Sequence, residues 1–105
     1  MAYYAMFYEV VDDFVARRAP FREEHLGLAQ DAHRRGEIVL AAALAEPANR
    51  ALIILRGESP EVARSFAQKD PYVRYGLVSH WELRPWTVVI GGDTTMPANR
   101  GAREP

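Results

Sequence analysis

The sequence contains no cysteine, which excludes disulfide bonds, thiolate metal sites and cysteine nucleophiles. No apolar run approaches the roughly 20 residues that span a bilayer, and residues 1–8 lack the basic start and long apolar stretch of a signal peptide. With 13 basic and 14 acidic residues the net charge is -1, so nothing marks a nucleic-acid partner. These absences predict a cytoplasmic protein that binds neither nucleic acid nor membrane.

Recognised metal and phosphate motifs are also missing. The three histidines stand at positions 25, 33 and 80, without the i,i+4 pairing or nearby carboxylates of zinc sites. Gly91 and Gly92 precede no helix, as a phosphate-binding loop requires, and the chain has no Gly-x-Ser-x-Gly elbow. We therefore expect no metal and no cofactor.

The 105 residues suffice for one domain. We assign residues 1–92 to it and residues 93–105 to a C-terminal tail, whose proline, glycine and arginine content is typical of disorder. Apolar periodicity predicts strands over residues 3–11, 38–44, 51–56 and 77–86. Residues 87–90 either continue the last of these strands or form a fifth. Helices are expected from Pro20 to a Gly36 cap, and from Pro60, with Ser59 as N-cap, to Asp70. The second helix has an inner stripe of Val62, Ala63, Phe66 and Ala67. Residues 14–19 form a loop or a short first turn, and residues 72–76 a loop or a loose turn.

This order, β-α-β-β-α-β, is the split βαβ arrangement of ferredoxin-like folds. It predicts an α+β domain with an antiparallel sheet and two helices on one face. The first three strands are apolar on both sides, whereas a sheet with one wet face alternates apolar and polar residues. We therefore expect the open face to meet a second copy of the chain in a homodimer.

The first predicted helix carries a titratable ring in its apolar stripe. Phe21, His25, Leu28, Ala29 and Ala32 share one face at 3.6 residues per turn. A histidine there can be functional, because its charge changes near neutral pH. It can equally be a core residue whose two nitrogens are satisfied by the protein.

Several segments resemble the YCII-related (YciI-like) family over residues 3–86. They are residues 4–8, Arg18 with residues 22–26, Gly36, residues 70–72 with 76–77, and residues 82–86. The resemblance implies a dimeric, ferredoxin-like α+β barrel with a site at His25 and Asp70. Family members with assigned chemistry include a dehydrochlorinase of a chlorinated hydroxyhydroquinone. One departure lies on the second strand, where relatives often have Gly-Pro and residues 41–45 are Ala-Ala-Ala-Leu-Ala. This difference bears on the shape of the pocket and so on which substrate it accepts.

A His–Asp pair needs no metal to move a proton. An aspartate that accepts from one imidazole N–H fixes the ring, and the other nitrogen can act as general base or acid. The expected fold brings His25 and Asp70 to one rim of the sheet, although Asp before Pro is also a common helix end. Arg22, one turn before His25, is a candidate for an anionic substrate oxygen, and Arg18 is a weaker one. Their alternative is a solvated helix edge that pairs with Glu23 or Asp12, and for Arg18 this alternative is favoured. Tyr72 and Ser79 are candidate hydroxyl donors, with packing and ordinary strand positions as their alternatives.

Two function hypotheses follow. The first is a cofactor-independent enzyme with lyase-like or hydrolase-like acid–base chemistry on a small aromatic or anionic metabolite. The second is a non-catalytic small-molecule-binding or accessory homodimer in which His25 is a buried polar anchor. They differ in whether a free imidazole nitrogen faces a cavity of roughly 300 Å³ or more. A monooxygenase of the related dimeric barrel type is a third hypothesis. Tyr4, Met6 and Tyr8 are candidates for lining an aromatic-substrate pocket, although packing in the core or at a dimer interface is the favoured interpretation.

Overall fold

A computed structural model describes residues 1–91 of the chain. The predicted tail, residues 93–105, lies outside the described residues. Within residues 1–91, no helix is long and apolar enough to cross a membrane.

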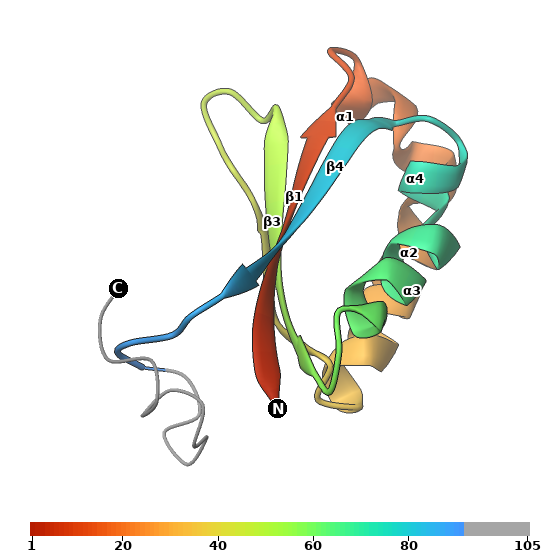
Figure 1. The fold of residues 1–105 in the computed structure, drawn as a ribbon. Coiled ribbons are helices and arrows are strands. Elements are labelled where there is room, and N and C mark those ends of the chain that lie inside the picture. The colour runs from red at the N-terminus through yellow and green to blue at the C-terminus, as the bar shows by residue number, and fades with distance from the viewer. Residues whose placement is uncertain (92–105) are drawn as a thin grey trace.

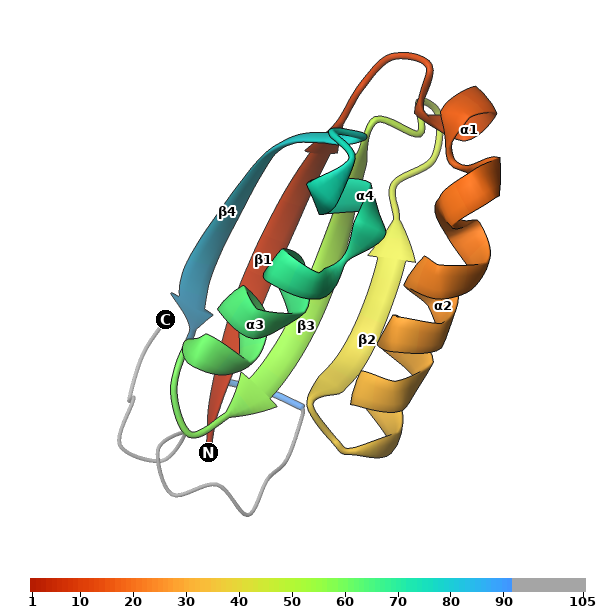
Figure 2. The same cartoon turned by 90° about the vertical axis from the view of Figure 1, so that its right-hand side faces the viewer.

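Four strands form one antiparallel sheet in the order β2-β3-β1-β4. They are β1 (Ala2–Val10), β2 (Ile38–Ala43), β3 (Arg50–Gly57) and β4 (Val78–Trp86). The two longer helices, α2 (Ala19–Arg34) and α3 (Glu61–Lys69), cover one face of this sheet (Figures 1 and 2). The ferredoxin-like α+β fold predicted from the sequence is confirmed, and residues 87–90 form no further strand.

Helix α2 forms where the sequence predicts it. Pro20 lies in its first turn, where its missing N–H costs no hydrogen bond. The chain leaves the helix at Gly36, whose φ of 81° suits glycine. Ala32 of the apolar stripe is buried, and His25 of the same stripe is half-buried. The helix therefore turns His25 toward the sheet.

Helix α3 begins one residue later than predicted. Pro60 occupies its N-cap position, and the Ser59 hydroxyl accepts a 3.3 Å hydrogen bond from the Glu61 N–H. Its predicted inner stripe is confirmed, because Ala63, Phe66 and Ala67 are buried. These side chains fill the space over β1 and β3.

Two single-turn helices lie in segments where the sequence predicts no long element. Residues 14–19, which the sequence leaves open between a loop and a short first turn, contain α1 (Phe14–Arg17). Residues 72–76, where the sequence predicts a loop or a loose turn, overlap α4 (Pro71–Arg74). Helix α4 forms because Asp70 is an extended N-cap whose carboxylate accepts from the Tyr72 N–H, while Pro71 takes the first helical position. Asp70 thus ends α3 and starts α4.

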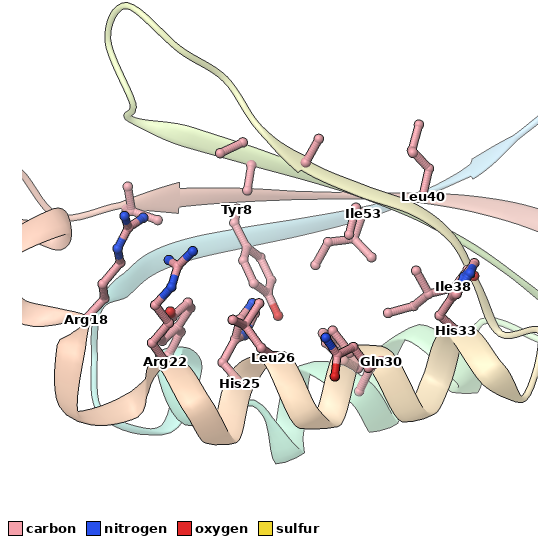
Figure 3. A pocket seen from close by; sticks show the side chains of 18 of the residues that line it. Tyr8, Arg18, Arg22, His25, Leu26, Gln30, His33, Ile38, Leu40 and Ile53 are labelled. Atoms are coloured by element: carbon pink, nitrogen blue, oxygen red, sulfur yellow. The ribbon is translucent and has the colours of Figure 1, made fainter.

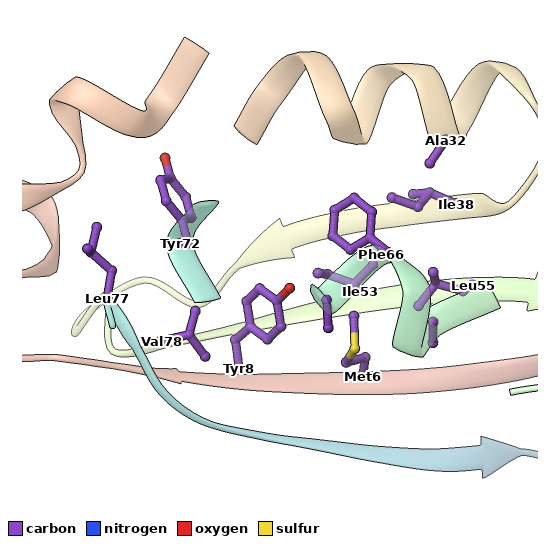
Figure 4. Packing of buried hydrophobic residues seen from close by; sticks show 12 residues of the cluster. Met6, Tyr8, Ala32, Ile38, Ile53, Leu55, Phe66, Tyr72, Leu77 and Val78 are labelled. Carbon is purple, nitrogen blue, oxygen red and sulfur yellow. The ribbon is translucent and has the colours of Figure 1, made fainter. Parts of the chain in front are cut away.

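The main core lies between the sheet and the helices (Figure 4). Its buried residues include Met6, Tyr8, Leu55, Phe66 and Leu77. Side chains alternate between the two faces of a strand, so the neighbours of the core residues in β1 point the other way.

The opposite face of the sheet is also apolar. Tyr3, Ala5 and Ile54 form a second buried cluster there, with Val88 packed against it. Beside this cluster, large side chains remain uncovered; Phe7 is 40% exposed and Leu40 is 64% exposed. Residues 1–91 of a single chain therefore do not cover this face.

Candidate active site

An open cavity of about 510 Å³ lies between α2 and the β2 side of the sheet (Figure 3). Helix α2 lines it from Arg22 to His33, with Arg18 just before the helix, and β2 lines it from Ile38 to Ala43. Ile53, Phe66 and Tyr72 contribute from β3, α3 and α4. The wall on the strand side is therefore apolar, and the charged side chains come from the helix side.

His25 projects from α2 into this cavity (Figure 3). Its Nδ1 lies 2.8 Å from Oδ1 of Asp70, which is completely buried, while the His25 side chain is 18% exposed. The fold thus brings together the two residues that the sequence paired, 45 positions apart.

Three donors converge on the Asp70 carboxylate. Oδ1 accepts from the Tyr72 backbone N–H at 3.0 Å as well as from His25, and Oδ2 accepts from the Tyr8 hydroxyl at 2.9 Å. An ionised carboxylate only accepts, so His25 Nδ1 carries the hydrogen and Nε2 of the neutral ring keeps its lone pair. No group within residues 1–91 occupies Nε2. The arrangement leaves His25 able to accept a proton on the cavity side.

Tyr8 belongs to this site although the sequence assigns it to packing. Burial raises the pKa of the Tyr8 hydroxyl far above its ordinary value, and the charge and hydrogen bond of Asp70 raise it further. Tyr8 therefore stays protonated and donates to Asp70. Strand alternation placed Tyr8 on the inner face beside Met6, but no sequence signal identified the partner of its hydroxyl.

The Tyr72 ring supports the imidazole from one side. The two rings are stacked at 4.0 Å between centroids with an interplanar angle of 15°, and Phe14 meets Tyr72 edge-on at 5.2 Å. The Tyr72 hydroxyl is buried next to the Arg22 guanidinium, and its own hydrogen has no acceptor among residues 1–91. Burial raises its pKa, and the neighbouring guanidinium groups of Arg22 and Arg18 oppose that shift. A ligand must therefore approach His25 at its edge, next to a protonated hydroxyl.

Arg18 and Arg22 line the cavity without a carboxylate partner among residues 1–91. Six other arginines of this part of the chain are in ion pairs: Arg17, Arg34, Arg35, Arg64, Arg74 and Arg84. The Arg18 guanidinium lies 5.6 Å from the centre of the Phe14 ring. Two uncompensated cations at one end of an apolar cavity favour a ligand with negative charge.

Ser79 lies elsewhere. Its hydroxyl donates to the Glu9 carbonyl at 3.2 Å, where the pairing of β1 with β4 shifts register, and it does not line the cavity. His80 is an exposed residue of β4, whereas His33 is held by the Ile38 carbonyl, 2.8 Å from its Nδ1. Within residues 1–91, no three His, Asp or Glu side chains gather as a metal site would require.

Comparison with curated proteins finds no match, but a family model described as YCII-related domain matches residues 1–87. One similar solved structure is 5-chloro-2-hydroxyhydroquinone dehydrochlorinase from Burkholderia phenoliruptrix AC1100, in complex with 2,5-dihydroxybenzoquinone. Its TM-score is 0.68 at 15% sequence identity, and the aligned region covers 80% of this chain and 92% of the dehydrochlorinase chain. A second is a candidate antibiotic biosynthesis monooxygenase from Deinococcus radiodurans, with TM-score 0.57, 10% identity, and 89% and 97% covered. At these identities the two structures show the shared fold.

Proposed function

The chain belongs to the YCII-related domain family, and we propose that it is a cofactor-independent acid–base enzyme acting on a small anionic or aromatic molecule. The observation that carries this proposal is the 2.8 Å contact of Asp70 with Nδ1 of His25, a residue that lines the cavity. A general base must reach its proton at hydrogen-bonding distance from a fixed position. Asp70, Tyr8 and Tyr72 supply that position for His25.

In the proposed reaction, His25 Nε2 accepts a proton from a carbon or hydroxyl of the substrate. The imidazolium that forms lies against the buried Asp70 carboxylate, which offsets its charge. The proton then returns to the product or leaves with a departing group. The dehydrochlorinase among the similar structures supports an elimination of this lyase type, which requires a base and a stabilised anion.

Arg22, Arg18 and the Tyr72 hydroxyl are the groups that we propose bind the substrate oxygen. Both guanidinium groups lack a carboxylate partner within residues 1–91, and the Tyr72 hydroxyl has a free donor. As the substrate loses a proton, negative charge grows on that oxygen, and donors already in place stabilise it without rearranging. Ser79 is not part of this proposal, because its hydroxyl is bonded to Glu9.

The experiment uses 2,5-dihydroxybenzoquinone as the first probe, followed by hydroxylated aromatic acids, with NMR for binding and absorbance for turnover. Arg22→Gln should weaken probe binding by about tenfold, the loss of one charge-assisted contact. Arg34→Gln is the matched control, since Arg34 lies at the far end of the same helix, paired with Asp31.

His25→Gln should keep probe binding and abolish turnover. Binding without turnover in the wild-type protein would favour the non-catalytic binding module over the enzyme. Equal probe binding by Arg22→Gln and wild type would contradict the proposed anion site.

We also propose that a second copy of the chain covers the open face of the sheet. The exposed Phe7, Leu40 and Trp86 continue the buried cluster around Ile54, and monomers rarely leave such contiguous apolar area in water. Sedimentation should show a dimer that Phe7→Lys dissociates. Val15→Lys, at a residue of α1 that is 55% exposed, should leave it intact. A monomeric wild-type protein would overturn this assembly.

A further inference from the structure

The cavity extends well beyond the reach of His25. Helix α2 lines it from Arg22 to His33, which corresponds to roughly 16 Å at 1.5 Å per residue. Its volume of about 510 Å³ lies in the range of pockets that hold drug-sized ligands. A single substituted ring next to His25 would leave much of this space empty.

The two guanidinium groups of the cavity and His25 are gathered at one end. Arg18, Arg22 and His25 lie in its left half in Figure 3, and Ile38 and His33 lie at the opposite end. Strand β2 runs antiparallel to α2, so Ala43 lies toward Arg22 and Ile38 lies beside His33. Between the two ends, the cavity is bounded mainly by apolar side chains, with Gln30 on the helix side.

The space between α2 and β2 exists because β2 carries small side chains there. Ala41 and Ala43 pair with Ile53 and Ala51, which places them on the helix-facing side of the sheet. Ile53 on this side is 3% exposed, yet Ala41 and Ala43 remain exposed. Helix α2 therefore lies over these alanines but does not pack closely against them, and a longer side chain at position 41 would enter the cavity.

We propose that the natural ligand has two parts, an anionic head held at Arg18 and Arg22 and an apolar body larger than one ring that lies along α2 against Ala41. The anionic head rests on the proposed function, and the apolar part of the ligand is the new element of this inference. Ala41 then determines specificity, because its size limits the length and thickness of the body. The class of ligand is an aromatic or enolic acid with a fused or second ring, or an equally bulky apolar substituent.

The test compares three probes with the same carboxylate head: benzoate, 2-naphthoate and biphenyl-4-carboxylate. Affinities are measured by NMR titration of the wild-type protein. An added ring that becomes buried removes apolar surface from water, so affinity should rise about tenfold from benzoate to biphenyl-4-carboxylate. Equal affinity for the three acids would overturn the two-part ligand.

Ala41→Leu should remove most of this gain and leave benzoate binding within about twofold of wild type. Ala45→Leu is the control, since Ala45 is exposed beyond the end of β2 and does not line the cavity. A gain that survives in Ala41→Leu would contradict the role of Ala41. Arg22→Gln separates the two proposals. If the proposed anion site is wrong, Arg22→Gln and wild type bind the acids with equal affinity. If the proposed apolar body is wrong, benzoate, 2-naphthoate and biphenyl-4-carboxylate bind with equal affinity.

Discussion

Replacing Tyr8 by phenylalanine tests the buried hydrogen bond that holds Asp70. The substitution keeps the ring, which is 2% exposed in the core, and removes the hydroxyl that donates to Oδ2 at 2.9 Å. Oδ1 keeps its two donors, so one oxygen of a buried carboxylate loses its partner. A hydrogen bond to a charged group contributes about 1.5–3 kcal/mol, and we expect Tyr8→Phe to lower the free energy of unfolding by about 2 kcal/mol at pH 7.

The pH dependence of this loss makes the test sharper. A tyrosine in the unfolded chain ionises near pH 10, whereas burial and Asp70 raise the pKa of Tyr8 in the folded protein. Above pH 10 the native state therefore holds a proton that the unfolded state has released, and the wild type loses about 1.4 kcal/mol of stability per pH unit. Tyr8→Phe lacks this loss. The difference between the two proteins should stay constant below pH 10 and shrink to roughly 0.6 kcal/mol at pH 11.

Urea denaturation between pH 7 and pH 11 measures both effects. Tyr72 titrates in both proteins, so its contribution cancels in the difference. Tyr4→Phe is the matched control, because Tyr4 is buried in the same strand on the same side of the sheet and its hydroxyl has no partner within residues 1–91. A difference for Tyr8→Phe that does not change up to pH 11, or an equal loss in Tyr4→Phe, would refute this reasoning.

Two further predictions use the same denaturation assay. Asp70→Asn should destabilise the protein by about 3 kcal/mol, because it removes a buried charge that three donors share. The ¹⁵N spectrum of His25 should then show less of the Nδ1–H tautomer. An unchanged tautomer population would argue against the His25–Asp70 pair. Gly27→Ala should stabilise by about 0.5–1 kcal/mol, because a Cβ in the middle of α2 meets nothing within 4 Å. Gly57→Ala should instead cost about 1–3 kcal/mol, since its Cβ would lie 2.9 Å from Cγ1 of Val62, and effects of one sign at both glycines would contradict this packing argument.

The four strands and two long helices were predictable because each carries a strong local signal. Alternation and continuous apolar runs mark the strands, and Pro20 and Gly36 mark the ends of α2. The short helix α4 was missed for an equally physical reason. Asp70 followed by proline reads as a helix stop, yet the same two residues are an N-cap and a first helical position.

The site was predictable only where topology constrains it. His25 faces the sheet because of the helical period, and the βαββαβ order brings Asp70 to it. The partner of the Tyr8 hydroxyl was not predictable, because alternation specifies a face and not a hydrogen bond. Within residues 1–91, the lack of a carboxylate partner for Arg22 depends on residues distant in sequence, and no local pattern encodes it.

The residues around His25 and the alanines of β2 come from different elements, and this separation affects how the sequence of such a protein can evolve. The side chains around the imidazole come from β1, α2 and the α3–α4 junction, whereas the alanine wall belongs to β2, which pairs with β3 alone. Substitutions in an edge strand disturb few neighbours, so changes at Ala41 can accumulate in evolution while the contact between His25 and Asp70 is kept. A single substitution there can then change which ligand the cavity accepts. Asp70, in contrast, both caps α4 and orients His25, so few substitutions are tolerated at this position.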